Sequence, residues 1–434
     1  MELTGHAGIR RWPGLIASGQ LSGVALLLAA STLLACQRTT DAALPSMRDS
    51  LGVTLIDYPV DLGQLPGSTW SVEPNPLFSI GDSALELDGV RAALFQSNGD
   101  VVIADGGSRQ LLFCDRRGAL CTRIGGDGRG PGEFQQLTSL SVGRGDSVFA
   151  YDGRDRRLSV FDPAGVFVRT VTLRGLDTLG NAEEIGSLRS GELAGAFRRR
   201  TPGTGLTRDS LAVVVLDSVG SPVLLLAVFP HLYVHWGPHP MPGGEGTATF
   251  PLPVPLSSVT ALTLGDGALY VGLPDESAVF RLDVDGSRRV TRAALMQRGI
   301  GQADRDRFFA GLSTRRVDPR ELEALRGIRG PDTWPAFGLE PLSAKVGESA
   351  LLVTDSGAVW LRPFRLPGDS VNEWPRLRPD GLYGGTVVMP TGFRPTSVRG
   401  DVVLGVHQDA LDVERVRAYR IRRDNQVRPP FNQR

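Results

Sequence analysis

Three histidines spaced by four residues are the first candidates for chemistry in this sequence. On a helix, His231, His235 and His239 would face one side, where their ring nitrogens could bind zinc. Three prolines within residues 230–240 oppose a helix, whereas a strand would still place His231 and His235 on one side. Two interpretations follow: a three-histidine metal site, or an aromatic-rich loop packed on the rim of the fold.

Two aspartates, Asp105 and Asp152, occupy equivalent places 47 residues apart, and a glycine follows each. Carboxylates that converged on one point could hold a divalent cation such as calcium, which could polarise a lactone or an ester. Alternatively, each carboxylate accepts hydrogen bonds from the amides of its own turn. Arg109 and Arg156 recur at the same spacing. We expect them to pair with the aspartates, and the alternative is that their guanidinium groups contact an anionic ligand.

Other catalytic patterns are missing from the sequence. The glycine-rich residues 125–132 lack the Lys-Ser/Thr ending of a phosphate-binding loop, and no serine lies in a Gly-x-Ser-x-Gly elbow. We therefore predict no catalytic residue. The 47 basic and 47 acidic residues give a net charge of zero, which argues against nucleic acid as a partner.

The first 36 residues have the pattern of an export signal. Two arginines precede an apolar run from Leu21 to Leu34, which is too short to span a hydrocarbon core of about 30 Å. The run closes with Ala35 and Cys36, and this ending resembles the bacterial lipoprotein signal. The resemblance implies that Cys36 carries the lipid, and that the outer membrane is the destination because Gln37 follows. The alternative is an ordinary secretory signal.

The remaining cysteines, Cys114 and Cys121, flank a turn signal at residues 115–118. On adjacent antiparallel strands they would lie close enough to form a disulfide in an oxidising compartment. A bulge at the turn would instead put them on opposite faces of the sheet as two reduced thiols. Both alternatives remain open at the level of sequence.

An internal repeat predicts the fold. Residues 99–105 align with residues 146–152, and the same shift of 47 residues superposes Gly118 on Gly165. In both copies the strand that ends in aspartate is followed by a strand that ends in Asp-x-x-Gly, and this turn recurs at residues 217–220 and 283–286. Aspartate can cap such a turn and glycine can take a positive φ. Six units of four strands, each of about 45 to 60 residues, predict an all-β, six-bladed β-propeller.

The sixth unit lacks its final strand, and a segment near the N-terminus is expected to supply it. Residues 76–81 resemble the last strand of the first unit, residues 121–125. Because they precede the first unit, they can complete the last sheet and close the ring. A short helical insertion is expected between blades four and five, at about 303–330, where Asp318-Pro319 is a helix start. It could gate a ligand site or only cover strand ends.

The expected organisation has four parts. These are a signal peptide over 1–36, a tether and N-terminal extension over 37–75, the propeller over 76–422, and a C-terminal tail over 423–434. The strand at 101–105, the Asp-x-x-Gly turn and the glycine-rich linker at 125–134 resemble NHL-type repeats. As a whole, residues 77–422 resemble a group of bacterial six-bladed propeller lipoproteins.

Two functions are compatible with this organisation. Because no acid, base and nucleophile stand out together, we favour a monomeric, lipid-anchored platform of the cell envelope that binds a protein, a peptide or a glycan and has no resident cofactor. The second hypothesis is a metal-dependent hydrolase or lyase, similar to gluconolactonase-type or amidating-lyase propellers. In that case the aspartates and histidines named above would surround a calcium or zinc ion.

Overall fold

The computed structural model of the chain describes residues 44–427 with short gaps at 61, 63–64, 66, 82–84, 242–244, 266, 294–298, 314–316, 334, 336, 343–347 and 366–371. The predicted signal peptide, with Cys36, and residues 428–434 of the predicted C-terminal tail lie outside the described residues. The described residues all belong to one compact unit.

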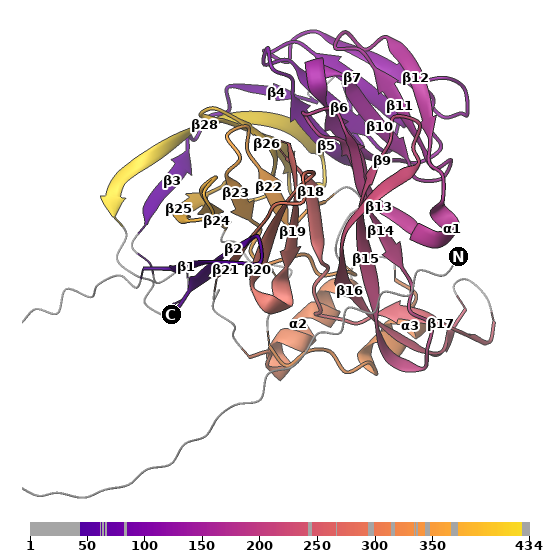
Figure 1. Cartoon of the computed structure of the whole chain (residues 1–434). Coiled ribbons are helices and arrows are strands. Elements are labelled where there is room, and N and C mark those ends of the chain that lie inside the picture. Colours follow the sequence, from indigo (N-terminus) through magenta and orange to yellow (C-terminus); the bar gives the residue numbers. More distant parts are fainter. Residues whose placement is uncertain are drawn as a thin grey trace, which may run out of the picture. The chain divides into compact units, whose positions relative to one another are not determined.

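The first three blades follow one another along the chain (Figure 1). Blade 1 contains β5 (Val90–Phe95), β6 (Val101–Asp105), β7 (Gln110–Cys114) and β8 (Cys121–Gly125). Blade 2 contains β9 (Leu137–Val142), β10 (Val148–Asp152), β11 (Arg157–Phe161) and β12 (Phe167–Thr172), with a 3-10 turn at Arg144–Asp146. After the short α1 (Leu176–Leu179), blade 3 contains β13 (Asn181–Ser187), β14 (Leu193–Arg199), β15 (Gly205–Leu216) and β16 (Pro222–Pro240).

The last three blades complete the ring. Blade 4 contains β18 (Ala261–Leu264), β19 (Ala268–Leu273), β20 (Ala278–Asp283) and β21 (Arg288–Ala293), with a 3-10 turn at Pro274–Glu276. Blade 5 contains β22 (Leu351–Val353), β23 (Val359–Leu361), β24 (Glu373–Leu377) and β25 (Tyr383–Val388). Blade 6 contains β26 (Phe393–Arg399), β27 (Val402–Gln408), β28 (Glu414–Val427) and β4 (Phe78–Ile80).

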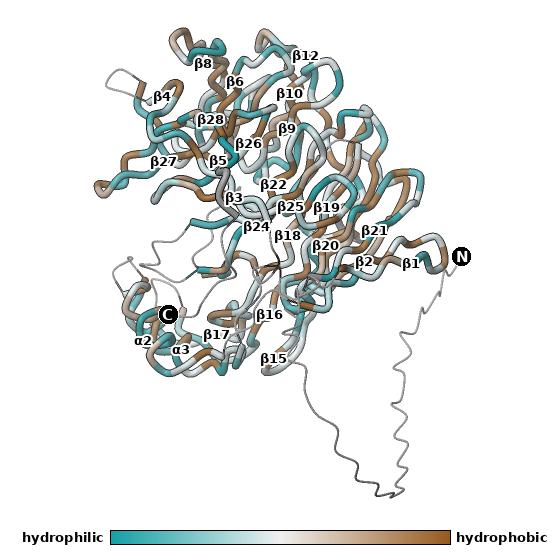
Figure 2. Tube along the Cα trace, turned by 90° about the vertical axis from the view of Figure 1, so that its left-hand side faces the viewer, coloured by the Kyte–Doolittle hydropathy of each residue, from teal (hydrophilic) through white to brown (hydrophobic). Residues whose placement is uncertain are grey.

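The core is divided among the interfaces between blades. The innermost strands touch in sequence around the ring: β5 with β9, β9 with β13, β13 with β18, β18 with β22, β22 with β26, and β26 with β5. A separate cluster of buried apolar side chains lies between each pair of consecutive blades. These clusters are formed by the apolar strand segments drawn brown in Figure 2. Blade-on-blade burial of this kind holds the propeller together.

The predicted N-terminal strand closes the ring. Strand β4 pairs antiparallel with β28, with Ile80 opposite Val416 and Phe78 opposite Ala418, so the prediction from residues 76–81 is confirmed. A further strand, β3 (Ser68–Val72), runs parallel to β25 and antiparallel to β28, and thereby joins blades 5 and 6. Figure 1 shows these indigo N-terminal strands beside the yellow C-terminal strand.

The N-terminal extension contains more structure than its sequence indicates. Strands β1 (Ser46–Ser50) and β2 (Val53–Tyr58) form a hairpin, and β2 pairs parallel with β21 on the outside of blade 4. Val53 and Leu55 of β2 pack against the cluster between blades 3 and 4. This hairpin covers an edge that would otherwise expose unpaired backbone groups.

The repeated turn has the geometry that its sequence predicts. In blade 1, Asp115 accepts hydrogen bonds from the amides of Ala119 and Leu120, and Gly118 has a φ of 67°. The copy in blade 2 has Gly165 at a φ of 89°. Glycine is required here because a side chain strains the backbone at positive φ.

The predicted helical insertion is present between blades 4 and 5. It consists of α2 (Gln302–Ser313) and α3 (Pro319–Arg326), and Asp318 caps α3 by accepting a hydrogen bond from the amide of Arg320. Leu322 and Leu325 face inward. Leu322 packs with Phe308 and Leu312 of α2, and Leu325 joins a cluster that includes Leu252 of β17 (Thr247–Pro253), the strand added to the far end of β16. No helix among the described residues is long and apolar enough to cross a membrane.

Candidate functional site

A cavity of about 140 Å³ lies where the innermost strands of the six blades meet. Each of β5, β9, β13, β18, β22 and β26 contributes to its wall. The wall carries the hydroxyl groups of Ser141, Ser187, Thr263, Thr354, Thr396 and Ser397. We call this cavity the central channel. A ligand in it can contact all the blades at once, which makes it the candidate binding site.

Hydroxyl groups near the central channel hold neighbouring blades together. The Ser187 amide of blade 3 donates to the Ser141 hydroxyl of blade 2 at 3.0 Å, and the Thr396 hydroxyl of blade 6 donates to the Ala93 carbonyl of blade 1 at 2.7 Å. Such bonds fix the wall of the channel, so a ligand meets a preformed surface.

Three charged residues line the central channel: Glu184, Arg189 and Asp355. Asp355 accepts a hydrogen bond from the Gly400 amide at 2.9 Å, and Arg189 is exposed. Glu184 differs from Asp355, because no described residue forms a hydrogen bond or an ion pair with the Glu184 carboxyl group. An acid without a partner in a narrow polar channel is available to a ligand.

A β-bulge positions Glu184. Ala182 lies opposite Phe197 and Glu184 lies opposite Ala196, so Glu183 is the extra residue in β13. Glu183 approaches Arg198, with an oxygen-to-nitrogen distance of 3.8 Å, while Glu184 lines the channel. The bulge therefore gives two adjacent acids different surroundings.

Burial raises the pKa of Glu184 to about 8, and repulsion from Glu183 contributes in the same direction. Desolvation favours the neutral form of a carboxyl group, and no described cation offsets this effect. Part of the side chain stays accessible from the channel. At neutral pH Glu184 is therefore mostly protonated, and a cation that entered the channel would favour its ionised form.

The three candidate histidines lie in strand β16, which continues through Pro240. A bulge at residues 231–232 interrupts the alternation that would place His231 and His235 on one side. His235 and His239 have ring centroids 5.6 Å apart, and the His239 ring packs edge-on against Phe250. Within the described ranges, no three histidine, cysteine, aspartate or glutamate side chains are grouped as metal ligands.

His231 is buried in a cationic environment. Burial lowers the pKa of His231 to about 3, and Arg198 and Arg208 lower it further in the same direction. Arg208 also donates to the Tyr233 hydroxyl at 3.0 Å and pairs with Asp275 at 2.8 Å. His231 is therefore a neutral side chain at physiological pH, within a network that ties β15 and β16 to blade 4.

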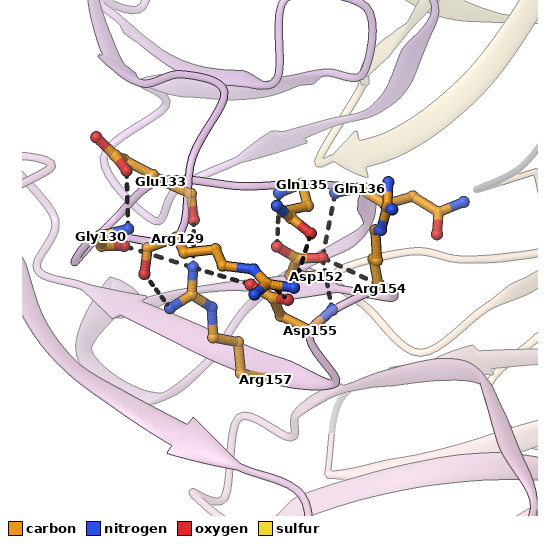
Figure 3. A network of polar contacts seen from close by, with 9 residues as sticks. All are labelled: Arg129, Gly130, Glu133, Gln135, Gln136, Asp152, Arg154, Asp155 and Arg157. Carbon is orange, nitrogen blue, oxygen red and sulfur yellow. Dashed lines mark hydrogen bonds and ion pairs between the residues drawn. The ribbon is translucent and has the colours of Figure 1, made fainter.

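The two candidate aspartates are engaged in their own blades. Asp105 accepts hydrogen bonds from the Asp88 amide at 3.1 Å and the Ser108 hydroxyl at 2.6 Å, and burial raises the pKa of Asp105. Asp152 accepts hydrogen bonds from four backbone amides, which belong to Gln135, Gln136, Arg154 and Asp155 (Figure 3). Neither carboxylate is part of the wall of the central channel.

The arginines beside these aspartates have other contacts. Arg109 forms an ion pair with Asp127 in the glycine-rich linker. The sequence instead predicts a pair between Arg109 and Asp105. Arg109 and Arg156 both have positive φ, 56° and 53°. Their recurrence thus coincides with a shared backbone conformation at the turn between the second and third strands of each blade.

The glycine-rich linker is a structural element that blade 2 holds in place. The Arg157 guanidinium donates to the carbonyls of Arg129 at 2.8 Å and Glu133 at 3.0 Å, as Figure 3 shows. The Glu133 carboxylate accepts a hydrogen bond from the Gly130 amide at 2.7 Å. These contacts give the linker a fixed conformation within the protein itself.

Cys114 and Cys121 are directly opposite one another in the β7–β8 ladder. Their sulfur atoms form a disulfide with an S–S distance of 2.06 Å and a Cα–Cα distance of 4.1 Å. The β7–β8 hairpin is therefore cross-linked at the position where its turn begins.

Comparisons with known proteins agree with the architecture. The model of a family described as a 6-bladed beta-propeller matches residues 92–177. The sequence matches no curated protein.

Solved structures of low sequence identity are similar to this chain. A member of the DUF4221 family from Bacteroides vulgatus is 10% identical, with a TM-score of 0.44 over 83% of this chain and 99% of that one. A catalytically inactive virginiamycin B lyase from Staphylococcus aureus, solved with quinupristin, is 11% identical (TM-score 0.39; 81% and 99% covered). The calcium-binding protein regucalcin from Agrobacterium tumefaciens is 11% identical (TM-score 0.38; 83% and 99%).

The order of the strands, the apolar clusters between consecutive blades and the family match lead to one conclusion about the fold. The chain is a six-bladed β-propeller, closed by an N-terminal strand and carrying a short helical insertion between blades four and five.

Proposed function

We propose that the protein is a lipid-anchored binding platform of the cell envelope, and that its central channel binds a primary amine. The amine could belong to a free small molecule or to a peptide. The observation that carries the proposal is Glu184, a channel carboxyl group with no hydrogen bond or ion pair to any described residue. No described cation forms an ion pair with this carboxyl group, and the ammonium group of the ligand would be that partner.

The composition of the wall favours a cation over an anion. Two carboxyl groups, those of Glu184 and Asp355, and one base, Arg189, line the channel. A cation that ionised Glu184 would meet two negative charges and one positive charge, whereas an anion would meet no net positive charge. An ammonium group is a compact cation with three donors, which the hydroxyl and carbonyl oxygens of the wall can accept. A cavity of about 140 Å³ has room for a few non-hydrogen atoms.

Binding is a better account of this site than catalysis. No histidine or cysteine is part of the wall of the channel beside Glu184. The hydroxyl groups of the wall therefore have no histidine beside them to activate them as nucleophiles, and no thiol takes their place. Such a wall can recognise a ligand, but it lacks the base and nucleophile pairs that group transfer or hydrolysis most often uses.

The anchor belongs to the same proposal. The apolar run that ends in Ala35 and Cys36 supports lipidation of Cys36, and the disulfide between Cys114 and Cys121 is of the kind that persists outside the cytoplasm. We place the protein at the outer membrane, because Gln37 follows the cysteine.

The channel is tested by calorimetric titration of the mature chain with propylammonium chloride. We expect a dissociation constant in the millimolar range, because one ion pair and a few hydrogen bonds contribute only about 4 kcal/mol. The variant Glu184→Gln should bind at least tenfold more weakly, while Glu276→Gln, which changes an exposed acid away from the channel, should bind as the wild type does. Equal binding by Glu184→Gln would remove the basis of the proposal.

The anchor is tested by mass spectrometry of the protein purified from membranes. The N-terminal peptide should begin at Cys36 and carry acyl chains, and Cys36→Ala should abolish the modification. An N-terminus downstream of Cys36, without lipid, would show an ordinary secreted protein instead.

A further inference from the structure

The outermost strand of blade 3 exposes an apolar surface. At the start of β16, the exposed fractions of Val223, Leu224, Leu225 and Val228 are 61%, 45%, 57% and 52%. Consecutive residues are exposed here because the outermost strand projects beyond the neighbouring blades, so both of its faces meet solvent. Among the described strands, residues 222–228 pair only with β15, which leaves the other edge of β16 free.

The other blades do not share this feature. The outermost strand of blade 1, β8, exposes Thr122 and Arg123. In blades 4 and 5, β2 and β3 cover the corresponding strands, β21 and β25. The outermost strand of blade 2, β12 (Phe167–Thr172), also has a free edge among the described strands, but it exposes one apolar residue, Val168, beside Arg169 and Thr170. A run of consecutive exposed apolar residues on a free outer edge is therefore the feature of blade 3.

The apolar surface continues toward blade 2. Val219, 53% exposed, lies in the turn that precedes β16. The Arg174 amide donates to the Gly220 carbonyl at 2.9 Å, and the Arg169 guanidinium donates to the Ser218 carbonyl at 2.8 Å. These bonds place the exposed end of β12 beside the turn.

The same surface continues toward the N-terminus. The Arg288 guanidinium donates to the Leu226 carbonyl of β16 at 2.6 Å, and Arg288 is opposite Val53 in the β2–β21 ladder. Leu51, at the tip of the β1–β2 hairpin, is fully exposed. We define the apolar rim as the exposed side chains of Leu51, Val219, Val223, Leu224, Leu225 and Val228.

Positive charge flanks the apolar rim. Arg169 and Arg174 bond to the turn before β16, and Arg288 bonds to β16 itself. No carboxylate of the described residues forms an ion pair with any of the three, and the acid of the turn, Asp217, accepts hydrogen bonds from the Val219 and Ser221 amides. Strand β16 itself contains no acidic residue. Apolar side chains bordered by arginines complement a bilayer with anionic headgroups, where the apolar groups enter the interface and the guanidinium groups meet phosphate.

We propose that the apolar rim lies against the membrane surface. The choice of a membrane over a protein partner rests on the proposed lipid anchor at Cys36. Nine residues lie between Cys36 and Ser46 at the start of β1, and such a tether spans at most about 35 Å. The hairpin that the tether leads into carries Leu51, one end of the rim. The anchor would therefore keep the hairpin, and with it the Leu51 end of the rim, within that reach of the bilayer.

This contact determines the orientation of the propeller. Because the rim belongs to an outermost strand, the axis of the ring runs along the plane of the membrane. The central channel lies on that axis, so a ligand reaches it from the side without crossing the lipid surface.

The test is flotation of the mature chain, produced without lipid from residue 37, with vesicles of phosphatidylethanolamine and phosphatidylglycerol. We expect the wild type to float with these vesicles and to bind pure phosphatidylcholine vesicles more weakly. The double variant Val223→Thr/Leu225→Thr should bind at least fivefold more weakly. Its matched control, Leu411→Thr/Val413→Thr, changes two exposed apolar residues of blade 6 and should bind within twofold of the wild type.

A second readout reports contact directly. Tryptophan emission of Leu224→Trp should shift to shorter wavelength when vesicles are added, whereas Leu411→Trp should show no shift. Failure of the wild type to float, or equal losses in the rim and control variants, would overturn the proposal. Analytical sedimentation provides a further test. A wild-type dimer that the double variant Val223→Thr/Leu225→Thr dissociates would also overturn the proposal, because the rim would then be an interface with a second copy of the chain. Because the protein lacks lipid in these assays, their outcome is independent of whether Cys36 is acylated.

Discussion

Glu414 of the last blade accepts a buried hydrogen bond from the backbone amide of Val90 in the first blade, at 2.7 Å, although 324 residues separate the two in the chain. The bond lies near the site where β4 pairs with β28, with Ile80 opposite Val416. Two contacts of different kinds thus close the ring at one place: a strand ladder, and a carboxylate that reaches the neighbouring blade.

Replacing Glu414 with alanine should lower the free energy of unfolding by about 2 kcal/mol, because it leaves the Val90 amide buried without its acceptor. Glu414→Gln keeps an acceptor oxygen and should lose less. Urea denaturation measures both, with Glu86→Ala, an exposed acid, as the control. A Glu414→Ala variant as stable as the control would show that this bond does not contribute to closure.

Glu184 should make the protein less stable as the pH rises. Its pKa of about 8 in the folded chain lies above the value of 4.5 for an unperturbed glutamate. Between these values the folded state keeps a proton that the unfolded state has released, so stability falls by up to about 1.4 kcal/mol per pH unit.

Urea denaturation between pH 5 and pH 8 measures the effect of Glu184. The stability of wild type relative to Glu184→Gln should decrease steadily over this range, while wild type and Glu276→Gln should change in parallel. Parallel curves for wild type and Glu184→Gln would mean that the Glu184 carboxyl group is solvated as in the unfolded chain.

His231 should have the opposite effect at acid pH. Its pKa of about 3 lies below the value of 6.5 for an unperturbed histidine, so the unfolded state binds a proton that the folded state excludes, and stability falls as the pH drops from 6.5 toward 3. NMR spectroscopy measures the protonation of the His231 imidazole, whose signal is assigned because it is absent from the spectrum of His231→Gln. The imidazole should remain neutral down to pH 4. Titration of that signal near pH 6.5 would contradict its burial.

The parts of the fold that sequence predicts are those in which the pattern is local. Gly118 and Gly165 mark the same turn in two copies of one unit, and Ile80 lies in a segment that resembles the last strand of that unit. The roles of β1, β2 and β3 could not be predicted in the same way. Strand β1 pairs only with β2 among the described strands, and the partners of β2 and β3, which are β21 and β25, are more than 200 residues away in the chain. Any free strand edge can accept such a partner, so the sequence does not specify which edge is used.

The candidate site was harder to predict than the fold. Asp105 and Asp152 attract attention because they repeat, but repetition reflects their role in the turns of the blades. Glu184 occurs once, and its position in the channel depends on the bulge at Glu183. The signal in the sequence was the pair of adjacent acids Glu183 and Glu184, just before the apolar end of an innermost strand. Two adjacent acids can avoid facing opposite sides of the sheet only if a bulge interrupts the alternation of side chains.

The central claim is that Glu184 binds an amine in the channel, and proton release on binding tests it most directly. Calorimetry of propylammonium binding at pH 7, in two buffers of different ionisation enthalpy, measures the number of protons released. We predict close to one proton per amine for the wild type, because binding ionises a carboxyl group whose pKa is about 8, and none for Glu184→Gln. Amine binding without proton release, or with the same release in Glu184→Gln, would contradict this account.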